Sequence, residues 1–93
     1  MTVGVLEIRL VIRAARSLKD KRRVVLSLKD RIRNEFSVSC AEVDKQDSLK
    51  EAVLGVAVVG TDAHVLEGVL QKAVGMVRRD RDAELVDFAI EWR

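Results

Sequence analysis

The chain has 93 residues, of which 48% are hydrophobic and 34% are charged. This length suits one domain, residues 1–93, and the low aromatic content of 3% predicts an aliphatic core. One cysteine excludes an internal disulfide, and one Cys with one His cannot form a Cys/His zinc site. We expect no signal peptide, because no basic stretch precedes an apolar run in the first residues, and no apolar run approaches the roughly 18 residues of a membrane span. We therefore expect a cytoplasmic protein that does not enter a membrane.

The net charge of +2 hides an uneven distribution. Residues 13–33 contain nine basic and two acidic residues, a net charge of +7, whereas the rest of the chain carries a net charge of −5. A cationic segment of this size attracts polyanions even when the whole chain is nearly neutral.

Residues 5–13 alternate between apolar and polar positions, which predicts a half-buried strand. Its buried side is Leu6, Ile8, Leu10 and Ile12. A helix should follow over residues 17–35, because Ser17 and Asp20 form a variant of the capping box. We expect this helix to bury a stripe of Val24, Leu28 and Ile32, with Val25 beside it.

Residues 37–44 predict a second strand, and a slip in its alternation indicates a bulge or a sheet edge. Cys40 lies among apolar neighbours there, so we expect a buried, inert thiol. After a polar turn, residues 52–59 are apolar on both faces, which is typical of a central strand.

Thr61 or Asp62 should cap a second helix. The residues that this helix should bury are Leu66, Val69, Leu70, Ala73 and Val77. The last predicted strand, residues 84–92, alternates again, with Val86, Phe88, Ile90 and Trp92 pointing inward.

The predicted order is strand, helix, strand, strand, helix, strand. Two β-α-β halves with right-handed crossovers give an α+β fold, the ferredoxin-like plait, in which a four-stranded antiparallel sheet carries both helices on one face. The expected core consists of Leu6, Ile8, Leu10, Ile12, Val24, Leu28, Ile32, Leu66, Leu70, Ala73, Val77, Val86, Phe88 and Ile90.

Several segments carry a family resemblance. They are Ser17-Leu18-Lys19-Asp20-Lys21-Arg22, Ser27-Leu28-Lys29-Asp30-Arg31, Val38-Ser39-Cys40-Ala41-Glu42-Val43-Asp44 with Gln46-Asp47, and Leu54-Gly55-Val56-Ala57. Together they resemble the YlxP-like family of small bacterial proteins with a domain of unknown function. The resemblance implies the ferredoxin-like fold and genes placed beside transcription, translation-initiation and ribosome-binding factors, but it implies no activity and no catalytic residue.

The basic segment supplies the candidate nucleic-acid site. At 100° per residue, five of its cations share about 120° of the first helix, opposite the apolar stripe, and two more precede that helix. The candidate residues are Arg13, Arg16, Lys19, Arg22, Arg23, Lys29 and Arg33. The alternatives are an acidic protein partner and a solvated helix face.

The uncovered sheet face supplies a second candidate surface. It should be apolar enough to associate with a second copy, and it should lack the aromatic residues on which RNA-recognition sheets stack bases. The expected dimer interface is Val5, Val11, Val43, Leu85 and Ala89, with Ala41 as the alternative to Val43.

No catalytic, metal or cofactor site is predicted, and no small-molecule substrate. The acidic residues Glu42, Asp44, Asp47 and Glu51 lack the spacing and glycine of a calcium loop, and His64 is one exposed side chain. Acylphosphatase has the same plait, but its glycine-rich phosphate loop is absent from residues 14–17. We therefore expect a non-enzymatic protein that binds structured RNA or the ribosome, with a dimeric protein-interaction module as the alternative and an acylphosphatase-like enzyme as a second alternative.

Overall fold

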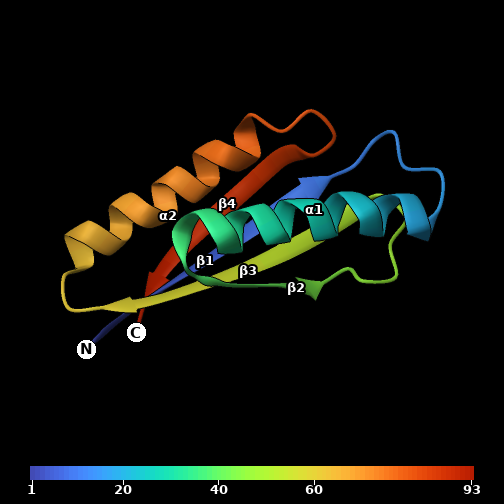
Figure 1. Ribbon diagram of the computed structural model, residues 1–93. Coiled ribbons are helices and arrows are strands. Elements are labelled where there is room, and N and C mark those ends of the chain that lie inside the picture. Colours follow the sequence, from blue (N-terminus) through green and yellow to red (C-terminus); the bar gives the residue numbers. More distant parts are fainter.

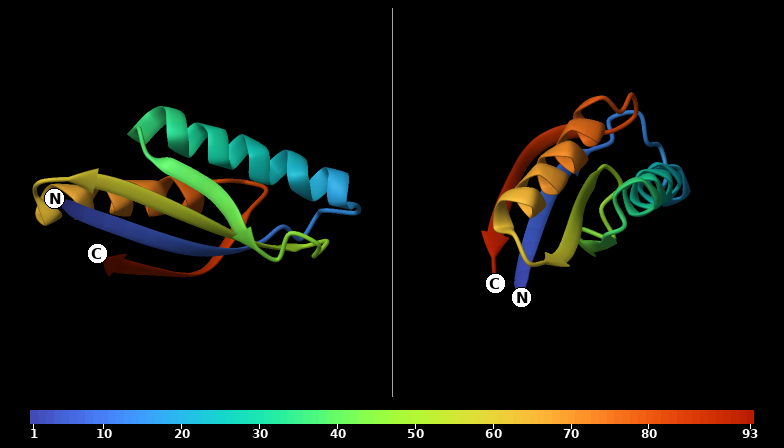
Figure 2. Two further views of the ribbon diagram at one scale, coloured as in Figure 1. Left: turned by 90° about the horizontal axis from the view of Figure 1, so that it is seen from below. Right: turned by 60° about the vertical axis from the view of Figure 1, so that its left-hand side comes forward.

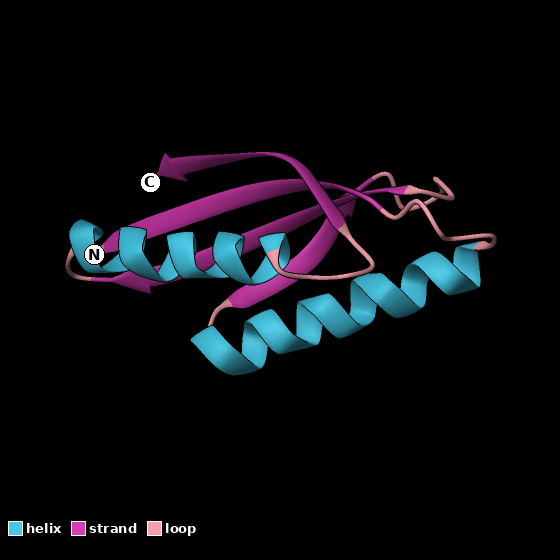
Figure 3. Cartoon of the chain, turned by 90° about the horizontal axis from the view of Figure 1, so that it is seen from above, coloured by secondary structure: helices cyan, strands magenta, loops and turns pink.

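The computed structural model describes residues 1–93 and has the expected element order. The elements are β1 (Thr2–Val11), α1 (Leu18–Phe36), β2 (Ser39–Asp44), β3 (Glu51–Gly60), α2 (Ala63–Arg78) and β4 (Glu84–Trp92). The strands pair antiparallel in the order β2-β3-β1-β4, and both helices cover one face of the sheet (Figures 1 and 3). This arrangement is the ferredoxin-like plait. Neither helix combines the length and apolar character that crossing a bilayer requires.

Local signals in the sequence set the helix ends. Ser17 caps α1, and its hydroxyl accepts a hydrogen bond of 3.1 Å from the backbone N–H of Asp20. Asp62 caps α2 through the N–H of His64. The helix α1 ends at Phe36, one residue past the predicted end, and its C-cap Ser37 takes the left-handed conformation with φ of 51°.

The core lies between the helices and the sheet. The prediction for β1 is confirmed, because Leu6, Ile8, Leu10 and Ile12 are all at most 2% exposed. Leu28 and Ile32 of α1 are fully buried, but Val25 completes the stripe while Val24 packs half-buried at its side. In α2, Val74 is buried and Val69 is only half-buried.

The expected inward side of β4 is partly wrong. A bulge breaks the β1–β4 register between Arg9 and Leu10, so that Leu85 pairs with Leu10 and packs against the core. Val86 is the extra residue and is 59% exposed, although it was expected inside. Phe88 and Ile90 keep the predicted side and lie half-buried against the core.

Two strands behave as expected of their positions. The strand β3 lies between β2 and β1, as its apolar character on both faces predicted. The strand β2 is an edge, and its pairing with β3 shifts between Glu42 and Asp44.

Gly4 makes room for Trp92 on the helix side, because a Cβ at Gly4 would lie 2.8 Å from the indole. The sheet is visibly twisted, with the helices kept to one side (Figure 2).

Candidate nucleic-acid interface

Four of the nine basic residues in residues 13–33 are held by acids. Lys21 pairs with Glu42, Arg13 with Glu84 at 2.6 Å, and Arg33 with Asp30 at 3.7 Å. Arg31 of α1 pairs with Asp80, which follows α2. These contacts neutralise much of the segment's charge, and Arg13 and Arg33 of the predicted site are among them.

The other five basic residues take part in no ion pair. These free cations are Arg16, Lys19, Arg22, Arg23 and Lys29. Four of them are exposed, and Lys29 is half-buried. The structure therefore reduces the predicted set of seven to five side chains whose charges are available to a partner.

The four free cations on α1 lie within about 120° of its circumference, on the side away from the buried stripe, which we call the basic side of α1; Arg16 precedes the helix. Lys29 and Arg33 come close enough to Cys40 of β2 to influence its thiol, whereas Arg31 lies about 160° around the helix from Lys29 and reaches Asp80 instead. From Lys19 to Arg33 the basic side extends over roughly 21 Å. Leu26, which is 52% exposed, lies among these cations, and sequence reasoning did not single it out.

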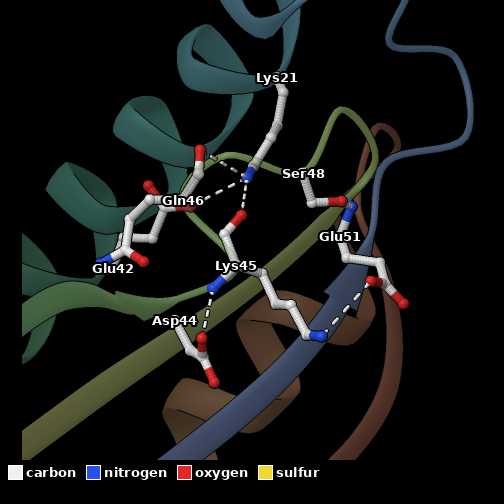
Figure 4. A network of polar contacts seen from close by, with 7 residues as sticks. All are labelled: Lys21, Glu42, Asp44, Lys45, Gln46, Ser48 and Glu51. Atoms are coloured by element: carbon white, nitrogen blue, oxygen red, sulfur yellow. Dashed lines mark hydrogen bonds and ion pairs between the residues drawn. The ribbon is translucent and has the colours of Figure 1, made fainter.

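Sequence reasoning missed the role of Lys21, which it counted only in the net charge of residues 13–33. Its side chain is completely buried, and its Nζ lies 3.1 Å from Glu42 Oε2 (Figure 4). The same ammonium donates hydrogen bonds to the carbonyls of Lys45 at 2.5 Å and Gln46 at 3.4 Å. Three acceptors thus surround the buried charge, as a desolvated ammonium requires.

The network around Lys21 shapes the turn between β2 and β3. Lys45 has φ of 62°, a left-handed conformation that disfavours a residue with a Cβ. Its carbonyl accepts from Lys21, while its N–H donates to Asp44 Oδ1 at 2.7 Å. Both backbone groups have partners, which fixes the turn against α1 (Figure 4).

Arg31 and Asp80 join α1 to the loop after α2. Burial alone would raise the pKa of the Asp80 carboxyl, but hydrogen bonds from Arg31 and from the backbone amides of Asp82 and Ala83 hold that pKa below its usual range. This pair is a structural contact, and it points one charge of the segment away from the basic side of α1.

The acidic stretch does not converge on one point. Glu42 faces Lys21 on the helix side, Asp44 accepts from the neighbouring amide, and Glu51 lies 4.0 Å from the Lys45 ammonium. His64 is exposed at the start of α2.

Cys40 is buried as predicted, and desolvation raises the pKa of its thiol to about 11 despite Lys29 and Arg33 nearby. Such a thiol stays protonated at neutral pH and is a poor nucleophile.

The loop between β1 and α1 also lacks the form of a phosphate cradle. The N–H groups of Ala15 and Arg16 already donate to the Ile12 carbonyl and to Asp20. From the other side, Lys50 donates to the carbonyls of Arg13 and Ala15. These contacts count against the acylphosphatase-like alternative, since that chemistry needs free amides converging on the phosphate.

The uncovered sheet face offers no aromatic side chain. Phe88 and Trp92 pair with Ile8 and Gly4, which face the helices, and the Phe88 ring lies 5.8 Å from the Arg78 guanidinium. Of the predicted dimer-interface residues, Val5, Val11, Val43 and Ala89 lie on the uncovered face. Leu85 does not, because the bulge in β4 turns it toward the core.

Comparisons with known proteins agree with this fold and add no activity. The family described as "Protein of unknown function (DUF503)" matches residues 3–90. The chain is 30% identical over 90 residues to "Uncharacterized protein YlxP" of Bacillus subtilis (strain 168), covering 97% of this chain and 98% of that protein. Among solved structures, "De novo designed protein Foldit4" matches with a TM-score of 0.56 at 14% identity, over 100% of this chain and 97% of that one, which supports the fold alone.

Proposed function

The chain belongs to the DUF503 family of proteins of unknown function, and we propose that this member is a non-enzymatic protein that binds structured RNA through the basic side of α1. The observation that carries the proposal is the set of five free cations, four on one side of α1 and Arg16 just before it. The proposal places the protein in the cytoplasm, with ribosomal RNA as the first partner to examine.

The charges on α1 favour binding to a polyanion over a helix face that contacts solvent alone. Unpaired like charges on one helix repel one another. Lys19, Arg22 and Arg23 form no ion pair within the fold that would offset this repulsion. Phosphates at regular intervals neutralise such a row, and each contact releases condensed counterions. The segment is therefore better suited to a nucleic-acid backbone than to a single small anion.

Recognition by charge and shape also suits the rest of the molecule. The uncovered sheet face has no aromatic platform on which bases could stack, so the sheet does not support base-specific reading of single strands. Double-stranded RNA is recognised mostly through its backbone and its shape. We expect affinity to follow duplex content and length rather than sequence.

The test is a charge reversal with a matched control. The variant Lys19→Glu/Arg22→Glu/Arg23→Glu removes three free cations from the first half of α1, and the carboxylate at residue 19, in the first turn, interacts favourably with the helix dipole. The control Lys72→Glu/Arg79→Glu/Arg81→Glu makes the same change in net charge on and after α2, at exposed residues that are also unpaired.

Binding is measured by fluorescence anisotropy with a labelled, hairpin-rich ribosomal RNA fragment in low salt. The α1 variant should lose more than about 100-fold in affinity at 50 mM salt, because three of five phosphate contacts are gone. The α2 control should lose much less. Equal losses in the two variants, or no binding by the unmodified protein, would overturn the proposal.

A further inference from the structure

The face of the sheet opposite the helices is uncovered (Figures 1 and 3). Its side chains divide it into two halves. The half over β2 and β3 is mainly apolar and contains a shallow hollow of about 310 Å³ lined by small and aliphatic side chains. The residues of this face that line the hollow are Val5, Ser39, Ala41, Val43, Gly55 and Ala57. Gly55 forms part of its floor, where a Cβ would come within 2.9 Å of Val43.

The half over β1 and β4 carries charges of both signs. Arg9 lies 3.7 Å from Glu7 on β1, and Arg93 lies 2.9 Å from Glu91 on β4. The mixture of signs gives this face no preference for a polyanion. It is instead complementary to itself, provided that a partner places its acids opposite these bases.

We propose that the uncovered face binds a second copy of this chain, sheet against sheet. The two-fold axis lies between the sheets, perpendicular to the strands, at the level of Ile8. This axis places apolar half on apolar half and charged half on charged half. An axis parallel to the strands would place apolar on charged, so the distribution of residues selects the first arrangement.

The register of the sheet fits this axis in the two rows nearest to it. Arg9 pairs across the sheet with Val53 and Asp87, and Glu7 pairs with Gly55 and Ala89. The axis therefore lays one row over the other, with Arg9 of one copy opposite Glu7 of the other. The same operation sets Val53 over Gly55 and Asp87 over Ala89, so that each larger side chain meets a smaller one. Further from the axis Val5 lies over Val11, but Glu91 comes opposite Glu84, so the charge complementarity is confined to the rows nearest the axis.

The experiment uses charge complementation at the two residues nearest the axis. Arg9 and Glu7 are 57% and 53% exposed, so their substitution leaves the fold intact. Sedimentation velocity from 1 to 100 µM should show the unmodified protein at twice 10.4 kDa. Arg9→Glu alone and Glu7→Arg alone should each weaken dimerisation at least tenfold, because each places like charges opposite one another.

An equimolar mixture of Arg9→Glu and Glu7→Arg should form a heterodimer, since each Glu then meets an Arg. The reversal Arg23→Glu on α1 serves as the control and should leave the dimer unchanged. A monomer at 100 µM, single variants that dimerise normally, or a mixture that stays monomeric would each overturn the proposed arrangement. None of these results depends on RNA, so this proposal and the RNA proposal fail separately.

Discussion

Lys19 and Lys21 lie two residues apart on α1, yet the first is exposed without an acid partner and the second is completely buried among three acceptors. Arg22 and Arg31 show the same contrast, since only Arg31 reaches an acid. The helix α1 thus contains cations whose ion pairs stabilise the fold and cations that form no ion pair. The difference shows that the net charge of a segment exceeds the charge that is available for binding, because paired charges are not available to a partner.

The largest effect should follow from removing the buried cation. Lys21→Met would leave the Glu42 carboxylate, 17% exposed, without its partner, and the carbonyls of Lys45 and Gln46 without their donor. We expect a loss of about 3 kcal/mol in the free energy of unfolding, measured by urea denaturation followed by circular dichroism. Lys19→Met is the matched control and should change stability by less than about 0.5 kcal/mol. Equal denaturation midpoints for the two variants would show that burial does not distinguish these lysines.

A smaller and pH-dependent effect should follow from Arg31→Gln. The pKa of Asp80 is lowered in the folded state, so the pair with Arg31 contributes stability above the unfolded pKa and loses it as the pH falls through the folded pKa. Because Arg31 is 49% exposed, we expect a loss of about 1 kcal/mol at pH 7 that shrinks as the pH falls below the ordinary carboxyl pKa of 3.8 and Asp80 becomes protonated. The measurement is thermal unfolding of both proteins from pH 7 downward. A difference that does not shrink in acid would contradict the assignment.

Most of the fold could be predicted from the sequence, because the signals that define it are local. Alternation gave the buried side of β1, the Ser17 and Asp62 caps set the starts of both helices, and the apolar residues 52–59 formed the central strand β3. The exchange between Leu85 and Val86 could not be predicted, because a bulge depends on pairing with β1 and both residues are equally apolar.

The candidate site was predictable only in part, for a related reason. Helical spacing identified the basic side of α1, but it could not show which cations have partners. Glu84 lies 71 residues from Arg13, and Asp80 lies 49 residues from Arg31. Lys21 occupies the same buried stripe as Val25, Leu28 and Ile32, yet its residue type predicts exposure.

The most direct test of the division between free and paired cations is the salt dependence of RNA binding. With five free cations, the slope of log K against log salt concentration should be about −4 for a duplex RNA. Arg22→Gln, which removes a free cation, should reduce the magnitude of that slope by about 1. Arg31→Gln, which removes a paired one, should leave the slope unchanged. Equal changes in slope for the two variants, or binding that does not respond to salt, would contradict the central claim.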